Sequence, residues 1–247
     1  MKIFIFILLI SGINASTVCF SQTKDTSVSE YSGFLTFAGL YQSGNTNKFL
    51  VQGKSEIKKE GKYLETILFF SGSYGENKSV KDDNTYYGAF TTDLFYKKTF
   101  STFILEYLEY NYSKGIELRS QTGGGVKYLF IRDTLHKSSV SLALIYDYLN
   151  LQINPGNTKS KELRFSFRVK SRHILMDDHL NLSFTGFFQP VVNNFSNANI
   201  YIEAIAEAPM TKAFRLNANY NYSFDNTVSA GRKRADNKLT FGAGFYF

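Results

Sequence analysis

Cysteine is nearly absent from this chain, and so are long apolar runs and helical periodicity. The only cysteine, Cys19, lies in the apolar N-terminal region. The rest of the chain therefore has no disulfide framework and no Cys-based metal or catalytic site. No stretch reaches the roughly 18 consecutive apolar residues of a membrane-spanning helix. No segment after the N-terminal region repeats apolar residues at helical spacing over a helix length.

The first residues are typical of a secretory signal. Met1 and Lys2 precede the apolar run IFIFILLISGI, which is too short to cross a bilayer as a stable helix. We expect cleavage after Ser21, and no lipidation at Cys19, because small residues do not precede it. The predicted organisation is a signal peptide at 1–21, a short periplasmic segment at 22–32 and a single barrel domain at 33–247.

The chain is basic, with 28 Lys and Arg residues against 21 Asp and Glu residues and a formal net charge of +7. In a cytosolic protein this excess would favour nucleic acid as a partner, but export argues against that partner. Anionic lipid, including lipopolysaccharide, and anionic solutes are the partners that suit the charge of an exported protein.

Apolar and polar residues alternate along most of the chain, which is the pattern of a β-strand with two different faces. This all-β pattern is interrupted by turn signals at regular intervals. It predicts strands at 33–42, 48–58, 62–74, 84–98, 100–112, 118–131, 138–150, 161–172, 178–190, 197–208, 213–225 and 236–247.

The segment ELRFSFRVKSR, residues 162–172, shows what the two faces mean. Leu163, Phe165, Phe167 and Val169 share one face, and charged or polar residues occupy the other. An open sheet would need a second sheet to cover its apolar face, whereas a closed barrel in lipid needs none and pairs every backbone group. The sequence therefore predicts an antiparallel transmembrane outer-membrane β-barrel of about twelve strands, with a polar lumen.

Tyrosine placement favours the membrane barrel over a soluble lipid-binding barrel. Tyr41, Tyr86 and Tyr220 lie near one set of predicted strand ends, and Tyr63 and Tyr128 lie near the other. Aromatic girdles mark the two headgroup levels around outer-membrane barrels. With no tryptophan in the chain, tyrosine is the residue that would form them.

The predicted connections alternate in length. Connections after odd-numbered strands are long, as at 75–83, 151–160 and 226–235, and those after even-numbered strands are tight. Outer-membrane barrels have long loops outside the cell and short turns in the periplasm. With an even number of strands, we expect both termini in the periplasm and the protein in the outer membrane.

Three segments resemble the bacterial family described as salt-induced outer-membrane proteins, a domain of otherwise unknown function. They are GLYQSGNTNKFLVQGKSEIKKEG, LRSQTGGGVKYLF, which carries Gly123, Gly124 and Gly125, and the closing DNKLTFGAGFYF. The resemblance implies a secreted β-barrel and no settled activity. The terminal Phe247 resembles the signal that the barrel-assembly machinery reads, which implies that machinery as a partner.

Charged residues of both signs are predicted to face the lumen. Two interpretations stay open: a narrow or gated channel in which rings of charge select small ionic or hydrophilic solutes, or a lumen sealed by ion pairs. Arg164, Arg168 and Lys170 favour anionic solutes, unless acids on neighbouring strands pair with them. The lumen-lining candidates are Arg119, Lys127, Arg164, Arg168, Lys170, Arg215, Glu106, Asp147 and Glu203.

The predicted external loops offer a third role, which is recognition of a partner. The basic loop with Arg232, Lys233 and Arg234 could contact lipopolysaccharide phosphates through charge-assisted bonds. An osmotic or salt-stress role in the envelope follows from the family resemblance alone. The barrel is expected to be a monomer.

Catalysis is the least favoured role. An outer-membrane hydrolase would need a histidine beside its nucleophile near the outer rim. His136, His173 and His179 all fall in or beside predicted periplasmic turns. No His, Asp and Glu cluster has metal-ligand spacing. We expect neither enzymatic activity nor a metal or other cofactor, and the glycine cluster is explained best by close approach of neighbouring strands.

Overall fold

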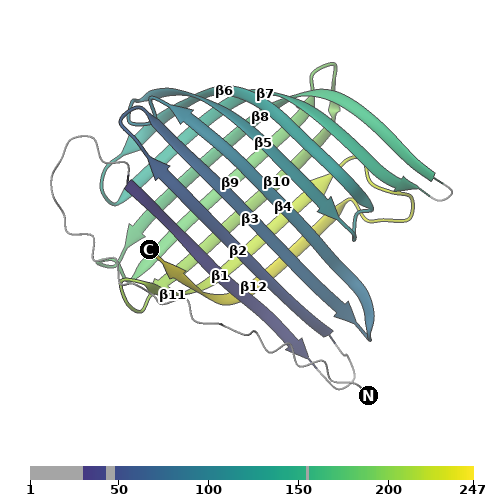
Figure 1. Ribbon diagram of the computed structural model, residues 1–247, viewed down its shortest axis with the longest axis horizontal. Helices are drawn as coiled ribbons and strands as arrows, with labels where there is room; N and C mark the ends of the chain where they lie inside the picture. The colour runs from purple at the N-terminus through teal and green to yellow at the C-terminus, as the bar shows by residue number, and fades with distance from the viewer. Residues whose placement is uncertain (1–29, 43–47, 154–155) are drawn as a thin grey trace, which may run out of the picture.

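The chain forms a single closed antiparallel barrel of twelve strands in a computed structural model that describes residues 30–42, 48–153 and 156–247 (Figure 1). This confirms the predicted fold. None of the described residues belongs to a helix long and apolar enough to cross a membrane. The strands are β1 (Glu30–Gln42), β2 (Lys48–Glu60), β3 (Leu64–Asn77), β4 (Val80–Leu94), β5 (Phe100–Asn111), β6 (Ile116–Arg132), β7 (His136–Ile153), β8 (Gly156–Leu175), β9 (Leu180–Val191), β10 (Asn194–Pro209), β11 (Phe214–Asp225) and β12 (Ala235–Tyr246).

The barrel closes where its first and last strands meet. Each strand pairs with its neighbours in sequence, and β1 pairs with β12. At this seam the backbone N–H of Gly33 donates to the carbonyl of Phe247 at 2.9 Å, and the N–H of Phe247 donates to the carbonyl of Gly33 at 3.0 Å. Closure leaves no sheet edge unpaired, which a hydrocarbon environment requires.

The two ends of the barrel differ in what they carry. Because the number of strands is even, the start of β1 and the end of β12 lie at the same end, on the left in Figure 1, together with the connections after even-numbered strands. We call this end the terminal rim. The opposite end carries the connections after odd-numbered strands, and we call it the loop rim.

Exposure along β8 settles which face of the strand points outward. Leu163, Phe167 and Val169 are 44%, 42% and 45% exposed, whereas Arg164 and Ser166 on the other face are 2% and 4% exposed. The apolar face therefore lies on the outside of the barrel and the charged face lines the lumen, as the alternation predicts. The same alternation holds along the other strands, with register shifts in the β3–β4, β5–β6, β6–β7 and β9–β10 pairs.

Two predicted long loops are wrong. Residues predicted as the connection 75–83 instead extend β3 and β4 to Asn77 and Val80, which pair across a two-residue turn. That turn is formed by Lys78 and Ser79 with φ of 50° and 62°, the twist that suits a tight hairpin. Polar residues in this stretch resemble a loop in composition, yet they pair as strand because they stand above the apolar belt, where both faces meet water.

The hairpin of β7 and β8 extends in the same way. Pairing continues up to Ile153 and Gly156, so most of the predicted loop 151–160 is also strand. β8 is 20 residues long, about twice the length that crosses a bilayer. Figure 1 shows this hairpin projecting beyond its neighbours at the loop rim. The predicted signal peptide, and most of the segment 22–32, lie outside the described residues.

The close approach of β7 explains the glycine cluster of β6. A Cβ added at Gly125 would meet the carbonyl oxygen of Leu142 at 2.1 Å and Cα of Ala143 at 2.6 Å, both on β7. Such contacts require a shift of the backbone, so only glycine fits here. The interpretation of these glycines as a point of close strand approach is confirmed.

The tyrosine girdles are present but incomplete. Tyr41, Tyr63 and Tyr128 are 78%, 54% and 41% exposed on the outer surface. Tyr87 and Tyr201, near the loop-rim ends of their predicted strands, face the lumen instead, where Tyr87 pairs with Glu109 and Tyr201 with Ser223 in the register. Strand-end position alone does not distinguish the two faces.

Candidate functional site in the barrel lumen

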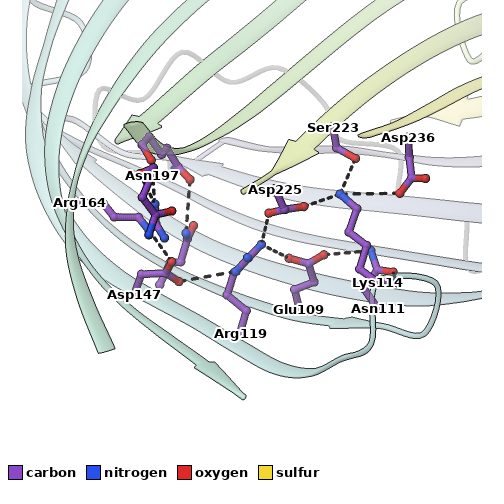
Figure 2. Close-up of polar contacts among 12 residues, drawn as sticks. Glu109, Asn111, Lys114, Arg119, Asp147, Arg164, Asn197, Ser223, Asp225 and Asp236 are labelled. Carbon is purple, nitrogen blue, oxygen red and sulfur yellow. Dashed lines mark hydrogen bonds and ion pairs between the residues drawn. The ribbon is translucent and has the colours of Figure 1, made fainter. Parts of the chain in front are cut away.

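The lumen holds many charged side chains, and they divide into two zones along the barrel axis. Near the loop rim, six charged side chains connect to one another across the lumen: Glu109, Lys114, Arg119, Asp147, Arg164 and Asp225. We call this set the cross-lumen network (Figure 2). Nearer the terminal rim, several charged side chains face the lumen without ion pairs.

The network begins on three adjacent strands. Nε of Arg164, on β8, donates to Oδ2 of Asp147, on β7, at 2.7 Å. The other oxygen of Asp147 lies 3.7 Å from Nε of Arg119, on β6. Arg164 also donates through Nη1 to the backbone carbonyls of Gln189 and Asn197, at 3.1 and 3.2 Å. Arg164 therefore fixes the wall formed by β7 to β10 from within.

The network then crosses the lumen. Nη1 of Arg119 donates to Oε2 of Glu109, on β5, at 3.2 Å and to Oδ1 of Asp225, on β11, at 2.8 Å. β6 and β11 are five places apart in the twelve-strand ring, nearly opposite one another. Lys114, in the connection after β5, also binds Asp225 and donates to Oγ of Ser223 at 2.9 Å.

All six network side chains are buried, with residue exposures between 1% for Asp147 and 8% for Glu109. Such burial brings a large desolvation penalty, so an ion-pair network of this kind is poor evidence for stability. Removing one member leaves a buried charge without its partner, which is strongly unfavourable. The network therefore fixes the closed arrangement of the lumen near the loop rim.

The connection between β11 and β12, residues 226–234, folds over this end of the lumen. Ser229 is 6% exposed, and its hydroxyl donates to the backbone carbonyl of Gln152, on β7, at 2.5 Å. The N–H of Gln152 donates to the carbonyl of Gly115 at 2.9 Å. Arg232 lies 5.5 Å from the ring centre of Tyr112. The predicted external basic loop, with exposed Arg232, Lys233 and Arg234, is thus attached to the far wall rather than free of the barrel.

Buried polar atoms without hydrogen-bond partners are concentrated in the lumen. Among the described residues they include atoms of Gln52, Ser71, Asn181, Asn199 and Asn217, all at lumen-facing positions of the register. An unpaired buried polar group typically costs about 1–3 kcal/mol unless water binds it. A cavity of about 10 Å³ beside Lys54 has room for roughly one water molecule.

Lys127, Arg215 and Glu203, three of the predicted lumen residues, pair with acids or bases that also face the lumen. Lys54 lies 2.6 Å from Glu203, which joins β2 to β10. Lys127 binds Asp93, and Arg215 lies 3.2 Å from Glu207. These pairs neutralise one another and leave no net charge at their positions.

Arg168, Lys170 and Arg172 follow Arg164 along the lumen face of β8 toward the terminal rim. None of the three has an ion pair among the described residues. Nε of Arg168 donates to Oγ of Ser141 at 3.1 Å, while Lys170 and Arg172 are exposed even though their register faces the lumen. This part of the lumen is therefore open to solvent at the terminal rim.

Two acids complete this zone. Glu56 and Glu65 face the lumen on β2 and β3, are partly exposed, and likewise have no ion pair within the described chain. Both carboxylates interact electrostatically with Lys170. We call the region lined by Glu56, Glu65, Arg168, Lys170 and Arg172 the vestibule.

Glu106 was placed in the lumen by the sequence, and that placement is wrong. It shares its face of β5 with Ile104 and Leu108, which are 60% and 48% exposed on the outer surface. Its carboxylate accepts hydrogen bonds from the hydroxyls of Ser120 and Thr122 on β6. Because β5 is apolar on both faces, alternation does not show which face points into the lumen. The charge of Glu106 was then the only signal for its side, and it indicated the wrong one.

The three histidines all lie at the terminal rim. His136 and His173 pair with each other at the terminal rim, with their Nδ1 atoms 3.1 Å apart. No group of three or more His, Cys, Asp or Glu side chains within the described ranges could hold a metal ion. His179 lies in the tight turn before β9 at the same rim.

Three members of the network were not singled out from the sequence: Glu109, Lys114 and Asp225. Lys114 and Asp225 stand at strand ends, in or beside connections, where a charged residue usually meets solvent. Arg119 and Asp147, by contrast, were identified from alternation. Periodicity can assign a residue to a face, but it cannot show that two strand ends meet across a lumen.

The closed ring, the apolar outer face and the charged lumen define this molecule as a β-barrel of the outer-membrane type. The chain belongs to the family described as protein of unknown function, DUF481, whose pattern matches residues 35–247. No curated protein matches the chain.

Comparison with solved structures finds similar chains at low sequence identity. The chain is similar to the NanC porin, with 11% identity, 86% of this chain and 98% of that chain covered, and a TM-score of 0.53. It is also similar to the KdgM porin in complex with disordered oligogalacturonate (10% identity, 87% and 99% covered, TM-score 0.46) and to the outer membrane channel DcaP of Acinetobacter baumannii (8% identity, 92% and 99% covered, TM-score 0.44).

Proposed function

We propose that this protein is a porin-like channel of a bacterial outer membrane, through which small hydrophilic or ionic solutes pass when the cross-lumen network opens. The observation that carries the proposal is the polar lumen, in which buried amide and hydroxyl groups such as those of Asn181, Asn199 and Gln52 lack protein partners. Groups of this kind are stable only when water reaches them. In such a lumen, solutes pass from the open vestibule once the side chains that meet across the lumen separate.

The constriction in this proposal is the network together with residues 226–234. Arg119 and Asp225 join opposite walls at 2.8 Å, and Ser229 fastens the connection to β7. Both contacts are side-chain contacts at strand ends, so they can separate without breaking a strand pair. The barrel wall would keep its hydrogen bonds while the lumen opens.

Single-channel conductance of the refolded protein in a planar bilayer tests this proposal. The wild type should show discrete openings across a salt gradient. The double variant Arg119→Ala with Asp225→Ala should open more often or to a larger conductance, because both partners of the cross-lumen bond are absent. Lys161→Gln, an exposed position on the outward-facing parity of β8, is the matched control and should behave as the wild type.

The second candidate is a sealed structural or ligand-recognition barrel that acts through its external surface. The buried network favours it, because the network closes the lumen near the loop rim. A folded wild type and a folded double variant that are both electrically silent would reject the channel and support this alternative. We propose no enzymatic activity under either candidate function.

We also propose that the terminal rim faces the periplasm. The assembly machinery would then read the strand that ends at Phe247, and the loop with Arg232, Lys233 and Arg234 would lie near lipopolysaccharide phosphates. The chain has no cysteine after Cys19, so single introduced cysteines can report orientation. A membrane-impermeant maleimide should label Lys233→Cys in intact cells and leave Thr211→Cys, at the opposite rim, unlabelled. The reverse pattern would contradict this orientation.

A role under salt or osmotic stress is supported by the resemblance of the three sequence segments to salt-induced outer-membrane proteins. Cells that lack the protein should then grow as the parent does at low salt and more slowly at high salt. Equal growth at both salt concentrations would contradict a stress role without affecting the channel.

A further inference from the structure

The vestibule carries unpaired charges of opposite sign on opposite walls. β8 and β2 are six places apart in the twelve-strand ring, so they face each other across the lumen, and β3 adjoins β2. Arg168, Lys170 and Arg172 lie on the β8 side, while Glu56 and Glu65 lie on the other. A solute in this region meets cations on one wall and carboxylates on the other.

The cationic wall is held in position by its surroundings. The guanidinium of Arg168 lies 5.2 Å from the ring centre of Phe103 and 5.9 Å from that of Phe187, which both face the lumen. Together with the hydrogen bond to Ser141, these rings orient the guanidinium without neutralising it. Lys170 follows on the same face, one pleat nearer the terminal rim, and is exposed.

The two acids of the opposite wall also have no ion pair among the described residues, although Lys58 lies near enough to interact with both electrostatically. Lys58, the cation closest in sequence to Glu56 on its lumen face, lies 2.5 Å from Glu60. Lys54, the next cation in the other direction, is paired with Glu203. Glu56 and Glu65 therefore have no ion-pair partner among the described residues and lie within electrostatic reach of Lys170.

We propose that the vestibule binds small zwitterions, with the anionic group of the solute at Arg168 and Lys170 and its cationic group at Glu56 and Glu65. The proposal rests on the proposed function, because it names the class of solute that would enter through this lumen. A simple anion would be attracted to one wall and repelled by the other, and a simple cation would meet the reverse. A molecule that carries both charges satisfies both walls at once, which gives specificity through complementary charges.

Binding to the folded barrel in a non-ionic detergent tests this proposal independently of passage. The probes are three solutes of similar size with charges that do not titrate near pH 7: taurine as the zwitterion, ethanesulfonate as the anion and choline as the cation. Isothermal titration calorimetry should show that taurine binds at least about tenfold more tightly than either single-charge solute, the ratio that one extra charge contact of about 1.4 kcal/mol gives.

Charge-neutral variants assign the two walls. Arg168→Gln with Lys170→Gln should abolish the preference of the site for taurine over choline, and Glu56→Gln with Glu65→Gln should abolish its preference for taurine over ethanesulfonate. Lys161→Gln should leave all three affinities unchanged. Circular dichroism and the heat-dependent gel mobility of each variant show whether it has folded.

Failures of this proposal and of the channel are distinguishable. Taurine that binds no more tightly than ethanesulfonate and choline, or that binds equally to folded variants of both walls, would overturn the zwitterion site, whatever the conductance. Selective taurine binding by a barrel that never conducts would support the site and overturn the channel.

Discussion

Arg164 and Arg168 are four residues apart on the same face of the same strand, yet they differ in burial and in ion pairing. Arg164 is 2% exposed and binds Asp147 and two backbone carbonyls. Arg168 rests between two aromatic rings with one hydroxyl as its partner and no carboxylate among the described residues. The position of a charged residue along the barrel axis, rather than its strand or its face, therefore decides whether it seals the lumen or remains available to a solute.

The largest expected effect on stability comes from removing a member of the cross-lumen network. Asp225→Ala removes a carboxylate that binds both Lys114 and Arg119, and it leaves two buried cations without that partner. We expect a loss of about 3–5 kcal/mol in the free energy of unfolding, measured by urea unfolding in lipid vesicles.

The matched change in the vestibule should leave the stability of the barrel almost unchanged. Lys170→Gln removes a lumen-facing charge that has no ion pair in the described chain, so the free energy of unfolding should change by less than about 0.5 kcal/mol. Equal losses from the two variants would remove the distinction between the sealed network and the vestibule.

A charge placed on the outer wall of the barrel tests a third environment, which is lipid. Leu216, on β11, is 46% exposed on the lipid-facing side, next to lumen-facing Arg215. Because Leu216 lies two residues after the start of β11 at the terminal rim, Leu216→Arg should destabilise the barrel by about 1–2 kcal/mol in lipid, between the values for a basic residue at the interface and at the bilayer midplane. Leu216→Ile is the control. Unchanged stability of Leu216→Arg would contradict the assignment of this face to lipid.

The smallest effect concerns a charge outside the barrel wall. Asp133, in the turn before β7, accepts hydrogen bonds from the backbone N–H groups of His136 and Leu135, which hold the pKa of its carboxyl below the usual value. Since the folded pKa is lowered, the ionised carboxylate stabilises the turn at neutral pH, and this contribution is lost as the pH falls through that pKa.

The variant Asp133→Asn keeps the acceptor oxygen and removes the charge. Its temperature of heat-dependent gel-mobility change should be slightly below that of the wild type at pH 7, and the two should converge as the pH falls below about 4. A difference that persists at low pH would assign the effect to geometry rather than to charge.

Much of the wall was predictable because alternation is a local property. The segment 162–172 by itself separated the lipid face, with Leu163 and Val169, from the lumen face, with Arg164 and Arg168. Prediction failed where the local signal was absent. β5 is apolar on both faces, so Glu106 was assigned to the wrong side. The extended ends of β3, β4 and β8 are polar on both faces, so their composition predicted loops.

The amino-acid sequence was enough to predict a closed antiparallel barrel with an apolar exterior and a charged interior. Strand periodicity and the need to pair every backbone group in lipid leave few other folds. Only the tertiary structure decided which interior charges meet. Arg119 and Asp225 are 106 residues apart in sequence and come from nearly opposite walls. Their contact depends on the tilt and register of the whole ring. Those same quantities leave Arg168 and Lys170 on the wall opposite Glu56 and Glu65, with no ion pair to any of the four in the part of the chain that the structure describes.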